Sequence, residues 1–436
     1  MAKKTLQRKS SRFIRTGRLL IGGATVALLI FFIWLDFPKR PKNPILASDG
    51  VTTSYCSAGA TAAYDHRHDP PNTTFYDNPK MSYSIDEPME KWDEKRREWL
   101  ESHPSFAGPD RVLLLTGSQP SPCLEDHLLL RLFKNKVDYC RINGGCDVFY
   151  STALLHPKLR SYWAKLPLIR AAMLAHPEAE WIWWVDSDAV FTDMEFKLPL
   201  RRYKDHNIVV QLWDHLAYEK KSWVGLNAGV FLIRNCQWSM DFMQVWASMG
   251  QQSPEFHKKG RLKISSVSDK MFPASDDQSA MMYLLLKGEK KWREKLYVEK
   301  EYYFQGYWQD IVGTIETVKE NYERMEKRVR FLRRRQAEKT VGSLAVVRER
   351  YLKAAGYGKG SWRRPFVTHF MACKQCNMGN NDPMYMGDSC SVGMEKALNF
   401  ADNQVLRQYG FVRPDLTNPY NLSVLPFDFP AGGGED

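Results

Sequence analysis

A run of five apolar residues that ends in two acids constrains this chain more than any other feature. Residues 181–185 (Trp-Ile-Trp-Trp-Val) predict a buried strand, and Asp186-Ser187-Asp188 follows directly. Sheets made of such strands are covered by helices and bind ligands at the carboxyl ends of the strands. The two carboxylates are therefore expected at a ligand-binding edge.

Strand and helix patterns alternate along the chain. Further segments that predict strands are 112–115, 147–150, 207–211 and 228–233. Helical spacing marks residues 128–140, and a second helix is marked by Trp163, Leu166, Ile169 and Met173, with Pro167 as an interruption. This alternation predicts an α/β fold with a mostly parallel sheet, and no internal repeat is visible.

The N-terminus carries 17 uncharged residues, 19–35, which is at the short end of what can span a bilayer. A cleaved signal peptide is the alternative, but its apolar core would be shorter, and a small-residue cleavage site is missing before Pro38-Lys39-Arg40. Seven cations in the first 18 residues favour a cytosolic N-terminus. We expect a single-pass type II protein with a cytosolic tail (1–18), a transmembrane anchor (19–35), a stem (36–87) and a lumenal catalytic domain (88–436). A short span suits thin membranes early in the secretory route, hence the Golgi.

A lumenal location predicts a glycoprotein with disulfides. Asn72-Thr73-Thr74 and Asn421-Leu422-Ser423 are glycosylation acceptors, whereas Asn418 is not because Pro419 follows it. The eight cysteines are Cys56, Cys123, Cys140, Cys146, Cys236, Cys373, Cys376 and Cys390. Some are expected to pair in an oxidising lumen, and the sequence does not fix which.

The net charge of +12 could indicate nucleic acid, a membrane surface or a phosphate-bearing substrate. The N-terminal cations belong with the membrane anchor, and a second basic stretch contains a helical pattern at 315–332. No nucleic-acid partner is therefore expected. The apolar positions of that pattern are spaced as in a coiled-coil dimer, but they are too few for one, and we favour a surface helix laid on the catalytic body.

Two carboxylates one residue apart repel each other unless a cation lies between them. Hard oxygen ligands suit Mn²⁺ or Mg²⁺, which can also bridge the two phosphates of a nucleotide sugar. A phosphatase of the haloacid dehalogenase type is the rival enzyme, because Asp186-Ser187-Asp188-Ala189-Val190 fits its motif and Asp276-Asp277 could supply its later acids.

The wider sequence decides between them. In order along the chain stand Thr116-Gly117-Ser118, the two acids, residues 225–235, Ser275-Asp276-Asp277-Gln278 and residues 369–376. Over about residues 69–430 the chain resembles glycosyltransferase family 34, which includes xyloglucan xylosyltransferases and galactomannan galactosyltransferases of plants. The likeness is strongest to the galactomannan branch, through residues 68–77, 135–141 and 193–200. It departs at Ala372, where the family usually has glycine.

The resemblance implies a GT-A fold and a set of site residues. Asp186, Asp188 and His369 would hold Mn²⁺, although a lone histidine is more often a core residue. Cofactor contacts are expected from Thr116, Gly117, Ser118, Asp138 and Tyr139 beside the uridine, from Ser187, and from Lys374 at the phosphates. Lys165 is a weaker phosphate candidate that could equally lie on a solvated helix face. Asn227, Asp276, Asp277 and Gln278 would surround the transferred sugar.

Cys373, Cys376 and Cys390 could suggest zinc, but a structural zinc site needs four ligands and His369 is the sole nearby candidate. A disulfide within this trio is expected instead. It would brace the loop that carries His369 and Lys374.

The expected reaction is retaining transfer of galactose from UDP-α-galactose to a β-1,4-mannan, forming α-1,6 branches in cell-wall polysaccharide synthesis. Transfer of xylose from UDP-xylose to a β-1,4-glucan is the alternative within the family. A carbohydrate-binding protein, or a scaffold partner that forms oligomers with other Golgi transferases, is the alternative outside it. Asp277 and Gln278 are the candidates for the face below the anomeric carbon, and a front-face mechanism is equally open.

A polymeric acceptor needs aromatic platforms, because the C–H faces of sugars pack well on rings. The candidates are Trp213, Trp223, Tyr302, Tyr303, Tyr307 and Trp308, each of which could instead be a core residue. The segment 302–308 is too aromatic for all of it to be buried.

Overall fold

The computed structural model describes residues 81–425, except 109, 119–125, 157, 160, 251–266, 270–274, 334–340, 358–359 and 374–388. All of them fall within the larger of the two units of the chain, Tyr64–Asp436. No helix in these ranges is long and apolar enough to cross a bilayer. The predicted tail, the anchor and most of the stem lie outside the described residues, and they stay predictions.

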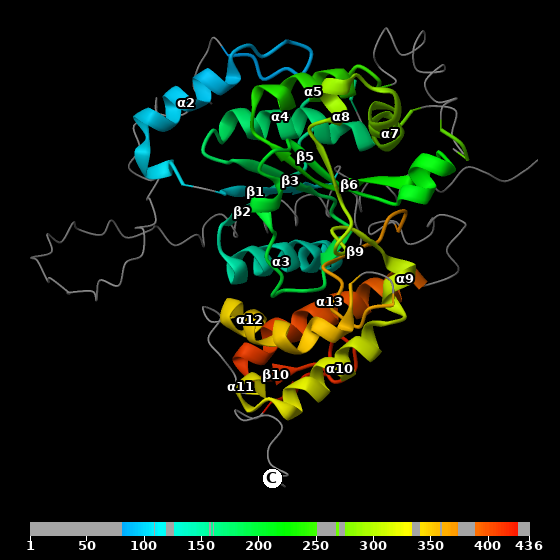
Figure 1. Ribbon diagram of the computed structural model, residues 1–436. Coiled ribbons are helices and arrows are strands. Elements are labelled where there is room, and N and C mark those ends of the chain that lie inside the picture. Colours follow the sequence, from blue (N-terminus) through cyan, green and yellow to red (C-terminus); the bar gives the residue numbers. More distant parts are fainter. Residues whose placement is uncertain are drawn as a thin grey trace, which may run out of the picture. The chain divides into compact units, whose positions relative to one another are not determined.

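A six-stranded sheet with the order β2-β1-β3-β6-β5-β7 forms the centre of the described region (Figure 1). Its strands are β1 Val112–Gly117, β2 Cys146–Ser151, β3 Trp181–Val185, β5 Ile208–Leu212, β6 Leu226–Arg234 and β7 Leu296–Glu299. β1 is parallel to β2 and β3, and β5 is parallel to β7, whereas β6 is antiparallel to both of its neighbours. The prediction of a mostly parallel sheet is confirmed, with β6 as the exception.

The sheet is buried on both faces, which explains its continuous apolar strands. Successive side chains of a strand point to opposite faces. Leu113 and Ile182 therefore pack in one core cluster, and Leu114 and Trp183 pack in the other. Helices α4, α5 and α7 cover the first face, and α3 covers the second (Figure 1). Ile85, within the predicted stem, is already buried in the first cluster.

The helices around the sheet are α2 Trp92–Ser102, α3 Asp126–Asn143, α4 Lys165–Ala175, α5 Gln237–Ala247, α7 Asp277–Lys287 and α8 Lys290–Arg293. A 3-10 helix, η4 Ser161–Ala164, leads into α4. Pro167 is the third residue of α4 and does not interrupt it. Backbone N–H groups in the first turn have no partner within the helix, so a proline there removes no bond.

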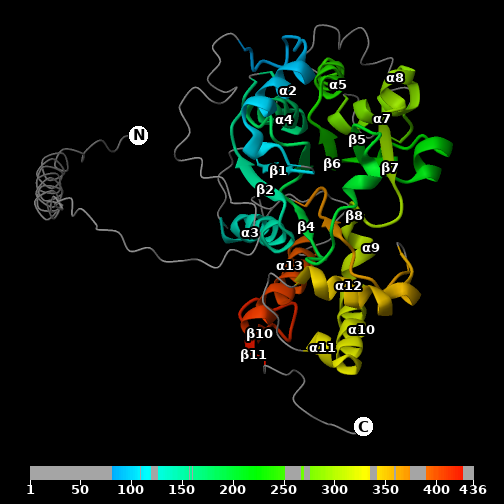
Figure 2. The same cartoon turned by 60° about the vertical axis from the view of Figure 1, so that its left-hand side comes forward.

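A second group of helices lies beyond α3, where α10, α12 and α13 gather (Figure 2). The elements of this region are α9 Trp308–Val312, α10 Ile315–Arg328, α11 Arg330–Arg333, α12 Val341–Leu352 and α13 Ser389–Tyr409. A two-stranded sheet, β10 Phe411–Val412 and β11 Ser423–Val424, follows α13. The predicted surface helix is confirmed, because Ile315, Val318 and Tyr322 are buried in the core of the same chain; α10 ends at Arg328.

A three-stranded sheet, β4 Ala189–Phe191, β9 Val367–His369 and β8 Gly306–Tyr307, lies between the two groups. Its middle strand, β9, is followed by the disulfide Cys373–Cys390, so the predicted pairing within the cysteine trio is confirmed. Cys140 and Cys146 form a second disulfide, and Cys236 is free. Cys56, Cys123 and Cys376 lie outside the described residues. Asn421 is exposed just before β11.

Candidate functional site

The two acids and the histidine converge on one point. Asp186 follows β3 directly, and β4 begins immediately after Asp188. β4 runs antiparallel to β9 with Ala189 opposite His369, which carries the imidazole back to the acids across 181 residues of sequence. His369 Nε2 lies 3.1 Å from Asp188 Oδ1 and 3.8 Å from Asp186 Oδ2. The predicted trio therefore forms one cluster.

The surroundings of the trio fit a divalent metal ion. One potential ligand atom from each residue lies within 4.8 Å of the others. His369 is 2 % exposed, and its Nδ1 has no hydrogen-bond partner among the described residues. A Cβ on Gly229 would collide with the His369 ring and stand 2.5 Å from Asp186 Oδ2, so this position requires glycine. Two carboxylates and an imidazole form an intermediate ligand set that suits Mn²⁺ more than Ca²⁺.

Lys165 is buried beside the trio. Its Nζ lies 2.8 Å from Asp277 Oδ2 and 3.4 Å from Asp186 Oδ1, and it donates to the Ala228 carbonyl at 2.9 Å. Burial opposes the charge, but the two carboxylates outweigh it and raise the pKa of Lys165. The solvated-face reading of Lys165 is therefore wrong. Its donors are taken by the protein, so these contacts give no support to a phosphate role.

The predicted sugar-facing residues lie along β6 and the start of α7. Asp276 caps α7 by accepting from Ser279 N at 2.7 Å. Gln278 accepts from Ala228 N at 3.3 Å and donates to the Trp223 carbonyl at 3.1 Å. Asn227 Oδ1 accepts from Gly229 N at 2.7 Å. These contacts join the start of α7 to the strand that also flanks the metal trio.

Thr116, Gly117 and Ser118 lie at the end of β1, on the same sheet edge as Asp186, because β1 and β3 are parallel. Thr116 is fully buried, and its hydroxyl has no hydrogen-bond partner among the described residues. A Cβ on Gly117 would collide with the Ser151 carbonyl. The structure thus places these three residues at the sheet edge that carries Asp186, and their contact with uridine stays a prediction.

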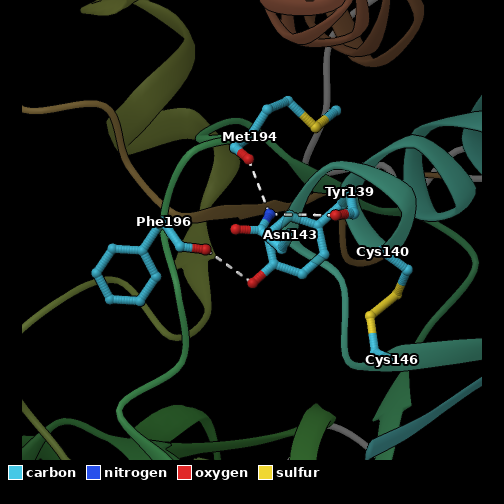
Figure 3. Close-up of a disulfide and its surroundings, with 6 residues drawn as sticks. All are labelled: Tyr139, Cys140, Asn143, Cys146, Met194 and Phe196. Atoms are coloured by element: carbon cyan, nitrogen blue, oxygen red, sulfur yellow. Dashed lines mark hydrogen bonds between the residues drawn. A yellow bond between two sulfur atoms is a disulfide. The ribbon is translucent and has the colours of Figure 1, made fainter. Parts of the chain in front are cut away.

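Asp138 and Tyr139 make contacts of a different kind. Tyr139 is buried, stacks on Phe191 with ring centroids 4.2 Å apart, and donates its hydroxyl to the Phe196 carbonyl (Figure 3). Asp138 pairs with Lys134 at 2.5 Å and with Arg141 at 2.7 Å. Tyr139 is thus a core residue and Asp138 an ion-pair residue of α3, and neither contact supports the predicted place beside uridine. Lys374 lies outside the described residues.

The aromatic candidates divide by exposure. Tyr302 and Trp308 are buried in the core cluster, so the platform reading is wrong for these two. Tyr303 and Tyr307 are half-buried, which agrees with the prediction that the segment is not wholly buried. Trp213 and Trp223 are half-buried as well, in the connection from β5 to β6.

Two residues near the site were missed. Tyr162 in η4 is 64 % exposed, and partial burial together with the acids Asp277, Asp276, Asp186 and Asp188 raises the pKa of its hydroxyl. Lys136 of α3 donates to the carbonyls of Ser187 and Ala189 on either side of Asp188. No residue pattern marks Tyr162, whereas Lys136 belongs to the segment 135–141 that carries part of the resemblance.

Known proteins resemble this chain over most of its length. The sequence model of the galactosyl transferase GMA12/MNN10 family matches residues 108–380. Galactomannan galactosyltransferase 1 of Cyamopsis tetragonoloba is 53% identical over 99% of this chain and 100% of the relative. Glycosyltransferase 6 of Arabidopsis thaliana is 53% identical over 95% of each chain.

A probable xyloglucan 6-xylosyltransferase 3 of Arabidopsis thaliana is 41% identical over 94% of this chain and 84% of the relative. Among solved structures, the galactosyltransferase LgtC in complex with donor and acceptor sugar analogs matches at 10% identity with a TM-score of 0.31. It covers 66% of this chain and 95% of that chain. A likeness of that size adds nothing to the argument from the site.

Proposed function

Because the chain belongs to the galactosyl transferase GMA12/MNN10 family, we propose that it transfers galactose from UDP-α-galactose to a β-1,4-mannan backbone. The proposal is carried by Asp186, Asp188 and His369, which lie close enough together to hold a metal ion. They do so in a chain that is 53% identical to a galactomannan galactosyltransferase over 99% of its length. A xylosyltransferase relative matches at 41%, which favours galactose over xylose. Family membership also removes the phosphatase reading.

We place the nucleotide sugar at the edge where β1 and β3 end, in a GT-A fold. A divalent ion held by Asp186, Asp188 and His369, for which Mn²⁺ fits the ligand set, would supply the charge that stabilises the departing UDP. Lys165 keeps Asp186 and Asp277 in place through its ion pairs with both. Asp277 and Gln278 are held by other protein groups, and we assign them to the wall of the sugar pocket. An intact trio argues against a carbohydrate-binding protein without turnover.

The donor and the acceptor are tested together with the purified full chain. UDP-galactose and UDP-xylose are each incubated with manno- and cello-oligosaccharides, and NMR identifies the linkage formed. We expect galactose on mannan in α-1,6 linkage. Xylose on cello-oligosaccharides, with manno-oligosaccharides untouched, would refute the substrate assignment and leave the family assignment standing. UDP release without transfer to any acceptor would indicate that the acceptor class is wrong.

The donor pocket separates galactose from xylose by one hydroxymethyl group, which a single wall can discriminate by about 1–3 kcal/mol. We therefore expect a preference of roughly 10- to 200-fold for UDP-galactose. Competition between the two donors in one reaction, with product ratios read by mass spectrometry, measures that preference directly.

We also propose that the enzyme is a type II Golgi membrane protein anchored by residues 19–35, with a glycosylated lumenal domain. Support comes from the sequence alone: an uncharged stretch, the cations before it, and the acceptor at exposed Asn421. Protease treatment of sealed Golgi vesicles should remove an epitope at the N-terminus and spare one at the C-terminus. The reverse pattern would refute the orientation.

A further inference from the structure

We propose that Lys136 is a positioning residue for the metal cluster. Buried beneath the turn that carries Asp186 and Asp188, it would hold that turn in the one shape in which both carboxylates face His369. This inference rests on the proposed metal role of the trio. It adds residues of α3, Lys136 and its neighbour Asn135, to the same site.

The contacts of Lys136 are unusual for a lysine. Its Nζ donates to the carbonyls of Ala189 at 2.8 Å, Ser187 at 3.1 Å and Leu132 at 3.3 Å, and the residue is 1 % exposed. An ammonium group has three hydrogens, so these three carbonyls use all of its donors. Burying an ammonium without a partner carboxylate is strongly unfavourable unless its hydrogen bonds are complete. The lysine is therefore tied to the shape of the turn.

The two tethered carbonyls flank Asp188 on either side in sequence. A backbone bond from Ala189 N to the Asp186 carbonyl, 3.1 Å long, closes the turn from within. Lys136 thus fixes from below a segment in which the side chains of Asp186 and Asp188 repel each other. Burial lowers the pKa of Lys136 to about 7, although the charges of Asp188 and Asp186 oppose that shift. Without Lys136 the turn could open and move the two carboxylates apart.

The neighbouring residue extends the same attachment. Asn135 Oδ1 accepts from Phe191 N at 2.8 Å, and its Nδ2 donates to the Phe191 carbonyl at 3.0 Å. Two consecutive residues of α3 therefore hold residues 187–191 at both ends. Ala189 is also the position opposite His369 in the β4–β9 pair, so the same attachment sets the imidazole relative to the acids.

The test measures metal affinity, not activity. Mn²⁺ is titrated into the full chain, and free Mn²⁺ is followed by its EPR signal. Lys136→Met keeps the length of the side chain and removes the donors. Removal of a group that orients metal ligands weakens metal binding by about 10- to 100-fold, and we expect a rise of that size in the Kd for Mn²⁺.

Lys134→Met is the matched control, two residues earlier on the same helix. Lys134 is 53 % exposed and pairs with Asp138 and Asp402, away from the turn. The Kd of the Lys134→Met variant for Mn²⁺ should stay within twofold of the wild-type value. Thermal unfolding without metal, followed by circular dichroism, establishes that each variant is folded before titration.

An unchanged Kd in folded Lys136→Met would overturn the proposal. If Lys136→Met does not fold, Lys136→Arg decides, because a planar guanidinium cannot direct its donors to the same three carbonyls. A rise of fivefold or more in its Kd supports the proposal, and an unchanged Kd overturns it. Asp188→Asn tests the metal site separately from the role of Lys136. Wild-type Mn²⁺ affinity in that variant would refute the metal site itself.

Discussion

Two charge clusters in this chain are built in opposite ways. The metal cluster, Asp186, Asp188 and His369, brings two acids and an imidazole together with Lys165 near one carboxylate oxygen. The arginine cluster, which consists of Glu195, Glu326, Arg348, Arg364 and Arg407, gives each acid two guanidinium partners. In the arginine cluster every acid is neutralised by the protein, whereas in the metal cluster the acids are brought side by side.

The difference separates structure from function. Glu326 lies 2.8 Å from Arg348 and 2.5 Å from Arg407, and so connects α10 to α12 and α13. Burial works against its charge, but the arginines outweigh it and lower the pKa of Glu326. The arginine cluster is thus complete within the fold and stabilises it. The metal cluster gains no stability from bringing two carboxylates together, which is the expected signature of a binding site.

The largest effect is expected on activity when the metal cluster is changed. Asp188→Asn removes a ligand oxygen and keeps the shape, and metal stabilisation of developing charge is worth several kcal/mol. The transfer rate should fall by about 1,000-fold or more. The free energy of unfolding without metal should stay equal or rise, because the repulsion between the two acids is relieved. Transfer assays and urea denaturation of the same preparation measure both quantities. Wild-type turnover would defeat the assignment.

The opposite pattern is expected in the arginine cluster. Glu326→Gln removes the carboxylate that buried Arg348 shares with half-buried Arg407, and it should cost about 3–5 kcal/mol of stability. The fraction that stays folded should transfer sugar at the wild-type rate. Urea denaturation measures the loss of stability, and the transfer rate per folded molecule shows whether activity is retained.

Glu323→Gln is the control, one turn earlier on α10. Glu323 is partly exposed and lies 3.4 Å from Arg407, so its loss should cost less than about 1 kcal/mol. Acid provides a further check. The folded pKa of Glu326 is lowered, so its stabilisation is present above its usual pKa of 4.5 and is lost as the pH falls below that value. Glu326→Gln should show a shallower loss of stability over that acid range, and an equal slope would contradict the assignment.

A smaller effect is expected where the metal cluster needs space. Gly229→Ala would press a methyl group against the His369 ring and Asp186. We expect a loss of about 1–3 kcal/mol in stability together with weaker Mn²⁺ binding. At Gly313, where nothing lies within 4 Å of an added Cβ, the same substitution should leave both unchanged. Thermal unfolding and Mn²⁺ titration compare the two variants, and equal behaviour would show that the close approach at Gly229 has no effect.

The sequence predicted the metal cluster in two different ways. The Asp186–Asp188 pair follows from the strand that precedes it, since a buried strand must end at a sheet edge. His369 came from family resemblance alone, because its place depends on the β4–β9 pairing, a contact between segments 181 residues apart that local periodicity does not reveal. Lys165 was misjudged for a related reason: its burial depends on Asp277, whose position is set by α7.

Other parts of the fold show the same limit. The reversed direction of β6 is invisible in its apolar run, because strands buried on both faces read alike in either direction. The arginine cluster joins Glu195, which follows β4, to residues of α10, α12 and α13. These ion pairs link segments far apart in the sequence, so only the tertiary structure reveals them. Tyr302 and Trp308 were open to either reading, and packing against the core decided between them.

The smallest effect is expected at Ala372, three residues after His369. Its φ is 65°, a left-handed backbone that glycine adopts without strain. Ala372→Gly should therefore stabilise the protein by about 1 kcal/mol. Ala171→Gly, inside α4, should lose a similar amount and serves as the control of opposite sign. Chemical denaturation gives both changes in stability. A loss of stability in Ala372→Gly would contradict the presence of backbone strain at this position.

Under the proposed function, Asp186, Asp188 and His369 bind one divalent ion at the nucleotide-sugar site. Anomalous diffraction at the manganese edge, from crystals grown with Mn²⁺ and UDP, tests it most directly. We predict one anomalous peak within bonding distance of carboxylate oxygens of both acids and of His369 Nε2, with the diphosphate on its open side. Bound UDP with no peak at these three residues, or a peak bonded to other residues, would contradict the account.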